Sequence, residues 1–517
     1  MSSNALRMLL LLLALLMPAS RRDWAGPGLA SGVVWAAETP AVAEIPLTAA
    51  STHEKGLGES LPLWSVIPFV GILLSIALLP LLTPHFWHHH FGKVAAFWSA
   101  LFVLPFAWGY GGHEALRVLL HIGVLDYLPF IILLTGLFVI AGGINLRGSL
   151  AGTPGVNTVL LLIGTLLASW IGTTGASMLL IRPVLKSNAH RSHKAHVVIF
   201  FIFLVSNIGG ALTPIGDPPL FLGFLHGVSF FWTLGHCLAP MALNAAILLG
   251  LFYALDAWLL RKEGGPRPEA AREPLRVEGL VNLLLLAGVI GAVILSGLLG
   301  DSPAFADPAS GLPRGLTLLA GTHPVVLPYL NLARDGAIVL LLLLSLQWTR
   351  RETRQANDFG WEPMLEVAKL FAGIFITIIP ALEILKAGSH GALAFVIERV
   401  SSDASYFWAS GSLSSFLDNA PTYLTFFNTA LGSLHPGLPE AQAVPLLMVQ
   451  HPLTLMAISC GSVFMGANSY IGNAPNFMVK SIAEQAGVKM PSFFGYMAWS
   501  VGILIPLFIL DTWLFFS

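Results

Sequence analysis

The stretch that decides the fold is Ser206–Phe221, which reads SNIGGALTPIGDPPLF. It directly follows the apolar run HVVIFFIFLV at residues 196–205, so we expect it to lie at membrane depth. Each proline removes a backbone donor and disfavours helix at the residue before it, so no straight helix can pass through the stretch. Irregular backbone at this depth is tolerated only where protein or a water-filled cavity supplies the missing hydrogen bonds. The stretch therefore predicts a broken transmembrane helix at a substrate or ion site.

The same design occurs a second time, 256 positions further along the chain. Residues 210–221, GALTPIGDPPLF, align there with residues 466–477, GANSYIGNAPNF. The glycines, a hydroxyl residue, the isoleucine, one proline and the phenylalanine coincide, whereas Asp217 is replaced by Asn473. Paired interruptions at matching places in two halves are the best sequence indication of the binding site of a secondary transporter.

The composition is that of a polytopic helical membrane protein. Of the 517 residues, 55% are hydrophobic and only 10% are charged, which is too little charge to cover a soluble protein of this length. The formal net charge of −1 gives no indication of a nucleic-acid partner, and we expect none. Cys237 and Cys460 form no metal-binding spacing and are expected to be small core residues.

The N-terminal region has the layout of a signal peptide. Arg7 precedes an apolar run, and small residues follow that run. Residues 1–37 are therefore expected to be a signal peptide, the alternative being a short uncleaved anchor. Residues 38–61 are small, polar and proline-containing, and are expected to be an extended or disordered extracytoplasmic segment.

Apolar segments of about 20 residues follow, which is the length that a bilayer requires. A polar linker at 261–278 divides them into a first repeat, 62–260, and a second repeat, 279–517. Each repeat contains one longer segment with a polar, helix-breaking centre, TTGAS at 173–177 and DNAPT at 418–422. Such a segment predicts a re-entrant hairpin whose tip reaches the bilayer midplane, with one long kinked helix as the alternative.

The number of spans and the loop charges indicate that the two repeats are inverted. With both hairpins set aside, each repeat has about five spans, and an odd number reverses the orientation of the second copy. Lys and Arg number 14 on the side assigned to the cytoplasm and 5 on the other, which leaves the N-terminus extracytoplasmic. We predict an all-α polytopic membrane protein of two inverted repeats, each of about five transmembrane helices plus one re-entrant hairpin, with discontinuous helices at the site. The expected location is a bacterial-type inner membrane.

Two acids lie on the interruptions, Asp217 on a broken helix and Asp418 at a hairpin tip. A carboxylate near the bilayer centre costs several kcal/mol unless it is paired, hydrated or protonated, so such an acid is usually functional. The alternative is that each acid caps the helix that follows it. Neutral oxygen-bearing and amide side chains on the same four interruptions suit a hard cation and also, together with helix N-termini, an anion. The expected substrate- or ion-binding residues are Thr173, Thr174, Ser206, Asn207, Thr213, Asp217, Asp418, Asn419, Thr422, Asn468, Ser469 and Asn473.

The motifs SNIGGALTPIGDPP, FLDNAPT and GANSYIGNAPN resemble the ion transporter superfamily, and within it the sodium/proton antiporters of NhaD type and the related putative citrate transporters. The resemblance implies a scaffold part, a moving transport part, two re-entrant hairpins and a homodimer. On this chain it implies site-forming roles for Asn207, Thr213, Asp217, Asp418, Asn419, Asn468 and Asn473. The first hairpin tip departs from the pattern, because Thr173-Thr174 stands where NhaD-type proteins carry Asp-Asn. The Ser-Asn-Thr of dicarboxylate members is present at neither tip.

These features predict a secondary active transporter that exchanges Na+ for H+, with the two acids binding cation and proton competitively. The alternative within transport is cation-coupled transport of citrate or another carboxylate, held by helix ends. An intramembrane aspartyl protease could use Asp217 and Asp418, but the chain has Pro-Ile-Gly-Asp where such an enzyme has Gly-x-Gly-Asp. We therefore expect no enzymatic activity, no cofactor and no resident metal, with Na+ and H+ as transported species. The expected partners are the lipid bilayer, a small inorganic cation or carboxylate, and a second copy of the chain.

Overall fold

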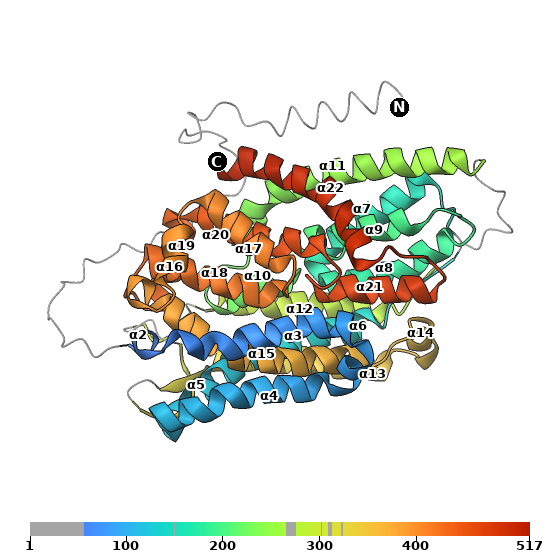
Figure 1. Cartoon of the computed structure of the whole chain (residues 1–517). Helices are drawn as coiled ribbons and strands as arrows, with labels where there is room; N and C mark the ends of the chain where they lie inside the picture. The colour runs from blue at the N-terminus through green and yellow to red at the C-terminus, as the bar shows by residue number, and fades with distance from the viewer. Residues whose placement is uncertain (1–55, 149, 265–275, 301, 309–312, 322–323) are drawn as a thin grey trace, which may run out of the picture. The chain divides into compact units, whose positions relative to one another are not determined.

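The computed structural model describes residues 56–517, apart from positions 149, 265–275, 301, 309–312 and 322–323 (Figure 1). The expected signal peptide, and the expected extended segment as far as residue 55, lie outside the described residues. Gly56–Ser517 form one unit, and it is this unit that is described below.

Nine helices of the described part are long and apolar enough to cross a membrane. Large apolar side chains on these helices face outward, for example Trp108, which is 92% exposed, and Leu284, which is 75% exposed. Soluble proteins rarely expose apolar side chains in such number, whereas a lipid-facing surface requires them. The prediction of an all-α polytopic membrane protein is confirmed.

The elements of the first half are helical except for one short strand. They are α2 (Leu57–Ser60), η1 (Leu63–Val66), α3 (Ile67–Leu82), α4 (Pro84–Tyr110), α5 (Gly112–His121), η2 (Ile122–Tyr127), α6 (Leu128–Ala141), β1 (Asn145–Arg147), α7 (Pro154–Ile171), α8 (Thr173–Ser187), α9 (Ala195–Leu204), η3 (Ile208–Gly210), α10 (Pro218–Leu225) and α11 (Trp232–Lys262).

The second half begins after strand β2 (Arg276–Glu278). Its elements are α12 (Val281–Leu298), β3 (Gly315–Leu319), β4 (Val325–Pro328), α13 (Tyr329–Trp348), α14 (Arg351–Ala356), α15 (Glu362–Lys386), η4 (Gly388–His390), α16 (Ala394–Arg399), α17 (Asp403–Ser414), α18 (Asn419–Leu434), α19 (Glu440–Gln450), α20 (Pro452–Phe464), η5 (Met465–Asn468), α21 (Ala474–Gln485), α22 (Phe493–Asp511) and η6 (Thr512–Phe516). β1 pairs antiparallel with β2, so the described end of the predicted linker joins a two-stranded sheet. β3 and β4 form a second antiparallel pair.

Contacts between helices define two groups. Group I consists of α3–α6 with α12, α13 and α15, and Figure 1 shows α3, α4 and α15 side by side within it. Group II consists of α7–α11 with α17–α22 and contains both hairpins and both broken helices. The groups meet where α15 contacts α18, where α6 contacts α8 and where α10 contacts η2.

Group II contains a helical hairpin at each of the two predicted places, and that their tips reach the bilayer midplane stays a prediction. α7 ends at Ile171, and Gly172, with φ of 79°, turns the chain into α8, a backbone conformation that favours glycine. Asn157 near the start of α7 and Asn188 at the end of α8 are hydrogen-bonded at 2.9 Å, so the chain reverses direction between them. In the second half α17 and α18 likewise pack against each other.

Both predicted broken helices are also present. In the first half α9 ends at Leu204, and irregular backbone with the short turn η3 leads to Asp217 and α10. In the second half α20 and η5 are followed by irregular backbone as far as Asn473, where α21 begins. Prolines occupy the first turns of α10 and α21, where a missing backbone N–H has no helical partner to lose.

Two further helices complete the arrangement. α4 begins at Pro84, directly after α3. α19 lies between the second hairpin and the second broken helix and meets α20 at an angle of 96°.

Candidate functional site

The two broken helices meet at their irregular segments. Asn473 donates from Nδ2 to the backbone oxygen of Ser206 (3.0 Å), to Oδ1 of Asn207 (3.3 Å) and to Oδ1 of Asp217 (3.1 Å). Asn207 in turn donates to Oδ1 of Asn476 at 2.7 Å. Stretches that lie about 260 positions apart in the sequence therefore share one hydrogen-bond network, as the repeated motif predicts.

Asp217 is the centre of this network and is only 1% exposed. Its Oδ1 accepts hydrogen bonds from Thr173 Oγ1 (2.8 Å) and from Asn473, and its Oδ2 accepts one from Asn419 Nδ2. Thr173 and Asn419 come from the two hairpin tips and Asn473 from the other broken helix. All of these donors are neutral, and none of the ion pairs among the described residues includes Asp217. The carboxylate is thus solvated by the protein but not charge-balanced by a basic side chain.

Four helices begin around this carboxylate. Gly172, Asp217, Asp418 and Asn473 are the N-cap residues of α8, α10, α18 and α21, respectively. A helix N-terminus carries about half a positive elementary charge. Together with the three neutral donors, these helix ends account for a buried acid without a basic partner.

The structure separates the two roles that the sequence left open for the acids. Asp217 makes no side-chain capping hydrogen bond to α10. Asp418 does cap its helix, because its Oδ1 accepts from the backbone N–H of Ala420 at 3.1 Å. Asp418 is half-buried, and Thr422 donates to its backbone oxygen at 3.0 Å. Asp217 is therefore the stronger site candidate, with Asp418 directly beside its partner Asn419.

Two of the expected binding residues, Thr213 and Ser469, make hydrogen bonds that brace the breaks. The hydroxyl of Thr213 donates to the backbone oxygen of Ser169 on the first hairpin, and that of Ser469 donates to the backbone oxygen of Ser415 on the second (2.5 Å). Each hydroxyl also accepts from the backbone N–H two residues later, at 3.2 Å. Matching side chains thus make matching bonds in the two halves, which gives the repeated motif a structural counterpart.

Three further expected residues lie around the edge of the network. Asn468 donates to Ser415 Oγ at 2.9 Å, Ser206 and Ser177 hydroxyls lie 2.9 Å apart, and Thr174 is half-buried in the first turn of α8. The Oδ1 atoms of Asn468 and Asn419 are buried without a hydrogen-bond partner among the described residues. Buried acceptors without a partner are rare, and amide oxygens are among the ligands that a hard cation prefers.

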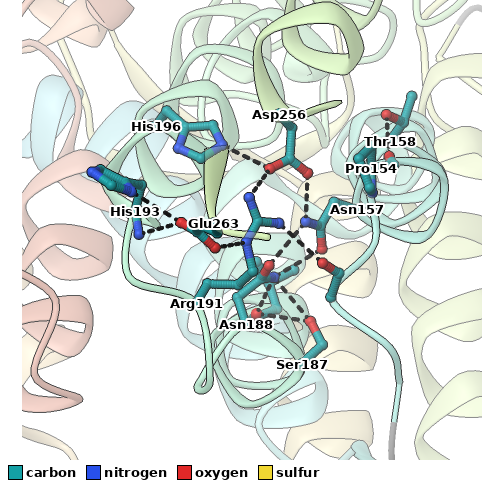
Figure 2. Close-up of polar contacts among 12 residues, drawn as sticks. Pro154, Asn157, Thr158, Ser187, Asn188, Arg191, His193, His196, Asp256 and Glu263 are labelled. Carbon is teal, nitrogen blue, oxygen red and sulfur yellow. Dashed lines mark hydrogen bonds and ion pairs between the residues drawn. The ribbon is translucent and has the colours of Figure 1, made fainter. Parts of the chain in front are cut away.

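A second buried polar cluster, the Asp256 cluster, was missed by the sequence reasoning (Figure 2). Asp256, near the end of α11, has Arg191 Nη2 at 2.8 Å and His196 Nε2 at 2.9 Å from its Oδ1, and its Oδ2 accepts from Asn157 Nδ2 at 2.9 Å. Arg191 also donates from Nε to Glu263 at 2.8 Å. The side chains of Arg191 and Asp256 are 1% and 0% exposed.

The Asp256 cluster connects three parts of group II. It links the open end of the first hairpin to the start of α9 and to the end of α11 (Figure 2). Each of its carboxylates faces a basic group. An acid inside the apolar segment 233–260 was a usable signal for Asp256. Nothing local pointed to Arg191, which lies in a polar loop.

Comparison with known proteins identifies one family. A family model described as "Putative citrate transport" matches residues 58–516. It corresponds to one of the two families that the motifs resemble, so that resemblance is confirmed, and the NhaD type remains a prediction. No curated protein matches the chain significantly.

Proposed function

The chain belongs to the putative citrate transport family and is a secondary transporter, and we propose that it binds a small cation at Asp217 and exchanges it for a proton. The observation that carries this proposal is the burial of Asp217 among neutral donors only. A buried carboxylate without a counter-charge is costly, and a bound cation or a proton removes that cost. Because one carboxylate holds either a proton or a cation, the two compete, which is the requirement for antiport.

A proton or cation bound at Asp217 would directly affect the hydrogen bonds that both hairpin tips make to this carboxylate. Thr173 and Asn419 donate to its two oxygens, so a proton or cation on the carboxylate weakens both oxygens as acceptors for the two hairpin tips. Asn419, whose Nδ2 bonds Asp217, has a buried Oδ1 without a hydrogen-bond partner among the described residues, and in this proposal that oxygen would help to ligate the cation. Binding and rearrangement of the tips are then one event, which couples the site to a change of conformation.

An internal two-fold arrangement also forms part of the proposal. Asp217 and Asn473 are equivalent in the sequence repeat and are in contact at 3.1 Å. Equivalent residues of two copies touch each other only near the axis that relates the copies. This supports inverted repeats with the site on their axis, and with it we propose an inner-membrane location and a homodimer.

Cation-coupled carboxylate transport is the second candidate, favoured by the family description and by the four helix N-termini around Asp217. In this case a cation at Asp217 would bind first, because a carboxylate substrate would otherwise meet Asp217 and Asp418 without a counter-charge. Both candidates therefore share a cation at Asp217 and differ in what is carried with it.

The test uses the purified chain in proteoliposomes with an imposed pH gradient. Antiport predicts that Na+ or Li+ collapses the gradient, and that Asp217→Asn abolishes the collapse. An intact gradient together with Na+-dependent accumulation of labelled citrate would favour the second candidate. Absence of both activities in a well-folded preparation would contradict a cation site at Asp217.

A further inference from the structure

A third polar cluster, the His226 cluster, joins the two helix groups at the far end of α10 from Asp217. α10 has Asp217 at its N-cap and His226 at its C-cap, about 12 Å apart for eight helical residues. Figure 1 shows α10 among the helices of group II, beside α18. Because α10 is a short, largely buried helix, holding or releasing His226 at one end also restrains or frees the segment that carries Asp217 at the other.

The imidazole of His226 lies between two carboxylates. Its Nδ1 is hydrogen-bonded to Glu440 Oε1, at the start of α19. Its Nε2 is 3.5 Å from Asp126 Oδ1, on η2, and is buried without a hydrogen-bond partner among the described residues. The side chains of His226 and Asp126 are 10% and 6% exposed. The ring thus bridges group II, which contributes His226 and Glu440, and group I, which contributes Asp126.

The surroundings of the ring include further ionisable groups. Lys386, at the end of α15 in group I, is 3.0 Å from Glu440 Oε2, so Glu440 is shared by two cations when His226 is charged. From α18 it is Phe427 that packs against the ring, with centroids 6.0 Å apart. The ionisable groups that face His226 are His121 from α5, Asp126 from η2, Glu440 from α19 and Lys386 from α15.

Only one protonation state of His226 satisfies both carboxylates. A neutral imidazole has one N–H and one lone pair, whereas an imidazolium has two N–H donors. If the neutral ring keeps its N–H on Glu440, the lone pair of Nε2 faces the Asp126 carboxylate and the contact becomes repulsive. With Asp126 ionised, the contact between Nε2 and Asp126 is therefore favourable only when the ring carries its second proton.

We propose that His226 is a positioning residue that fastens α10 to group I when it is protonated and releases it when it is neutral. The helix that carries Asp217 is then held tightly at low pH and loosely at high pH, so transport is gated by pH at a place remote from the binding site. This inference rests on the transporter function proposed above but not on which solute is carried.

The first test is amide hydrogen exchange of residues 218–228 in the purified full chain in lipid nanodiscs. Rates are corrected for intrinsic exchange and compared between about pH 5.5 and about pH 8.5, the range in which histidine changes charge. In the wild type we expect protection of this segment to fall about tenfold as the pH rises, while α12, which contains no histidine, serves as an unchanged reference. The tenfold change corresponds to the loss of one charge-assisted contact.

Two variants make this test decisive. His226→Gln is neutral at every pH and should show the low protection throughout. Asp126→Asn keeps His226 but removes the carboxylate that faces Nε2, and should also lose the pH dependence, which keeps the test informative if one variant folds poorly. Protection of 218–228 that is independent of pH in the wild type, or a wild-type profile in both variants, would overturn the proposal.

The second test is the pH profile of transport. His226→Gln should match the wild type within about twofold at high pH, where the wild-type ring is neutral, and differ from it at low pH. A merely structural role would lower activity equally at all pH values and would overturn the proposal. If neither the wild type nor any variant transports a solute while amide hydrogen exchange of residues 218–228 still depends on pH, the proposed function fails and the His226 proposal stands.

Discussion

Two aspartates buried in the same helix group have opposite electrostatic surroundings. Asp256, which is fully buried, has Arg191 and His196 within 3 Å and accepts a further hydrogen bond from Asn157. Asp217, which is 1% exposed, has neutral donors alone. Both acids lose their water on folding, but only Asp256 receives a full compensating charge. The difference indicates which acid holds the fold together and which is available to a cation or proton.

The comparison has an energetic basis. Desolvating a carboxylate costs several kcal/mol, and a well-placed ion pair with additional hydrogen bonds offsets most of that cost. Three neutral donors and four helix ends offset less of it at Asp217. A bound cation or proton neutralises the carboxylate and removes the remaining cost. This relief of the unfavourable empty state contributes to the free energy of binding.

The largest expected effect follows from Asp217→Asn. An amide of the same shape cannot hold a cation and proton competitively, so we expect exchange to fall by more than about a hundredfold. Removing an unbalanced buried charge should leave the thermal unfolding midpoint unchanged or raise it. Exchange in proteoliposomes and unfolding followed by intrinsic fluorescence measure the two quantities. Wild-type exchange in this variant would remove Asp217 from the transport path.

The matched control is Asp256→Asn, which makes the identical change in the charge-balanced cluster. Arg191 and His196 then lose their shared carboxylate, and we expect a loss of about 3 kcal/mol in the free energy of unfolding. Exchange per folded molecule should stay within a few-fold of the wild type. A stable but inactive Asp256→Asn protein would contradict the comparison, because it would place the Asp256 cluster in the transport path.

Thr173→Val tests how much each neutral donor contributes to Asp217. The substitution keeps the shape of the side chain and removes one of three hydrogen bonds, at 2.8 Å, to the carboxylate. One such bond is worth about 1–1.5 kcal/mol, so we expect a loss of transport rate of about tenfold, far smaller than for Asp217→Asn. Thr173→Ser, which retains the hydroxyl, is the control and should stay close to the wild type. Equal losses in both variants would mean that the methyl packing matters and the hydroxyl does not.

The sequence predicted the breaks because their signal is local. Glycine, proline and polar residues inside an apolar run cannot form a straight helix, and the structure has a helix interruption at each of the four places. The residue types alone could not show where a hydroxyl points, so Thr213 and Ser469 were expected at an ion but bond to backbone oxygens. The helix groups that bring residues together were not visible in the sequence either. Arg191 and Asp256 lie 65 positions apart, and no local pattern pairs them.

The smallest effect is expected at the rim of the Asp256 cluster, from Glu263→Gln. Partial burial alone would raise the pKa of Glu263, but hydrogen bonds from the backbone N–H of His193 and from Arg191 outweigh it and hold the pKa below its usual range. A carboxyl whose pKa is lowered by folding stabilises the fold fully above its unfolded value of about 4.3, and this contribution is lost as the pH falls through the folded value.

At neutral pH we therefore expect Glu263→Gln to lower the thermal unfolding midpoint, by less than Asp256→Asn does because solvent screens a group at the end of α11. The difference in unfolding midpoint between the variant and the wild type should become smaller below about pH 4, because the wild-type carboxyl takes up its proton there. Unfolding midpoints measured at about pH 7 and about pH 3.5 decide the point. A difference that is the same at both pH values would show that the charge of Glu263 contributes nothing, and that the stability of the cluster comes from the pair of Asp256 and Arg191 alone.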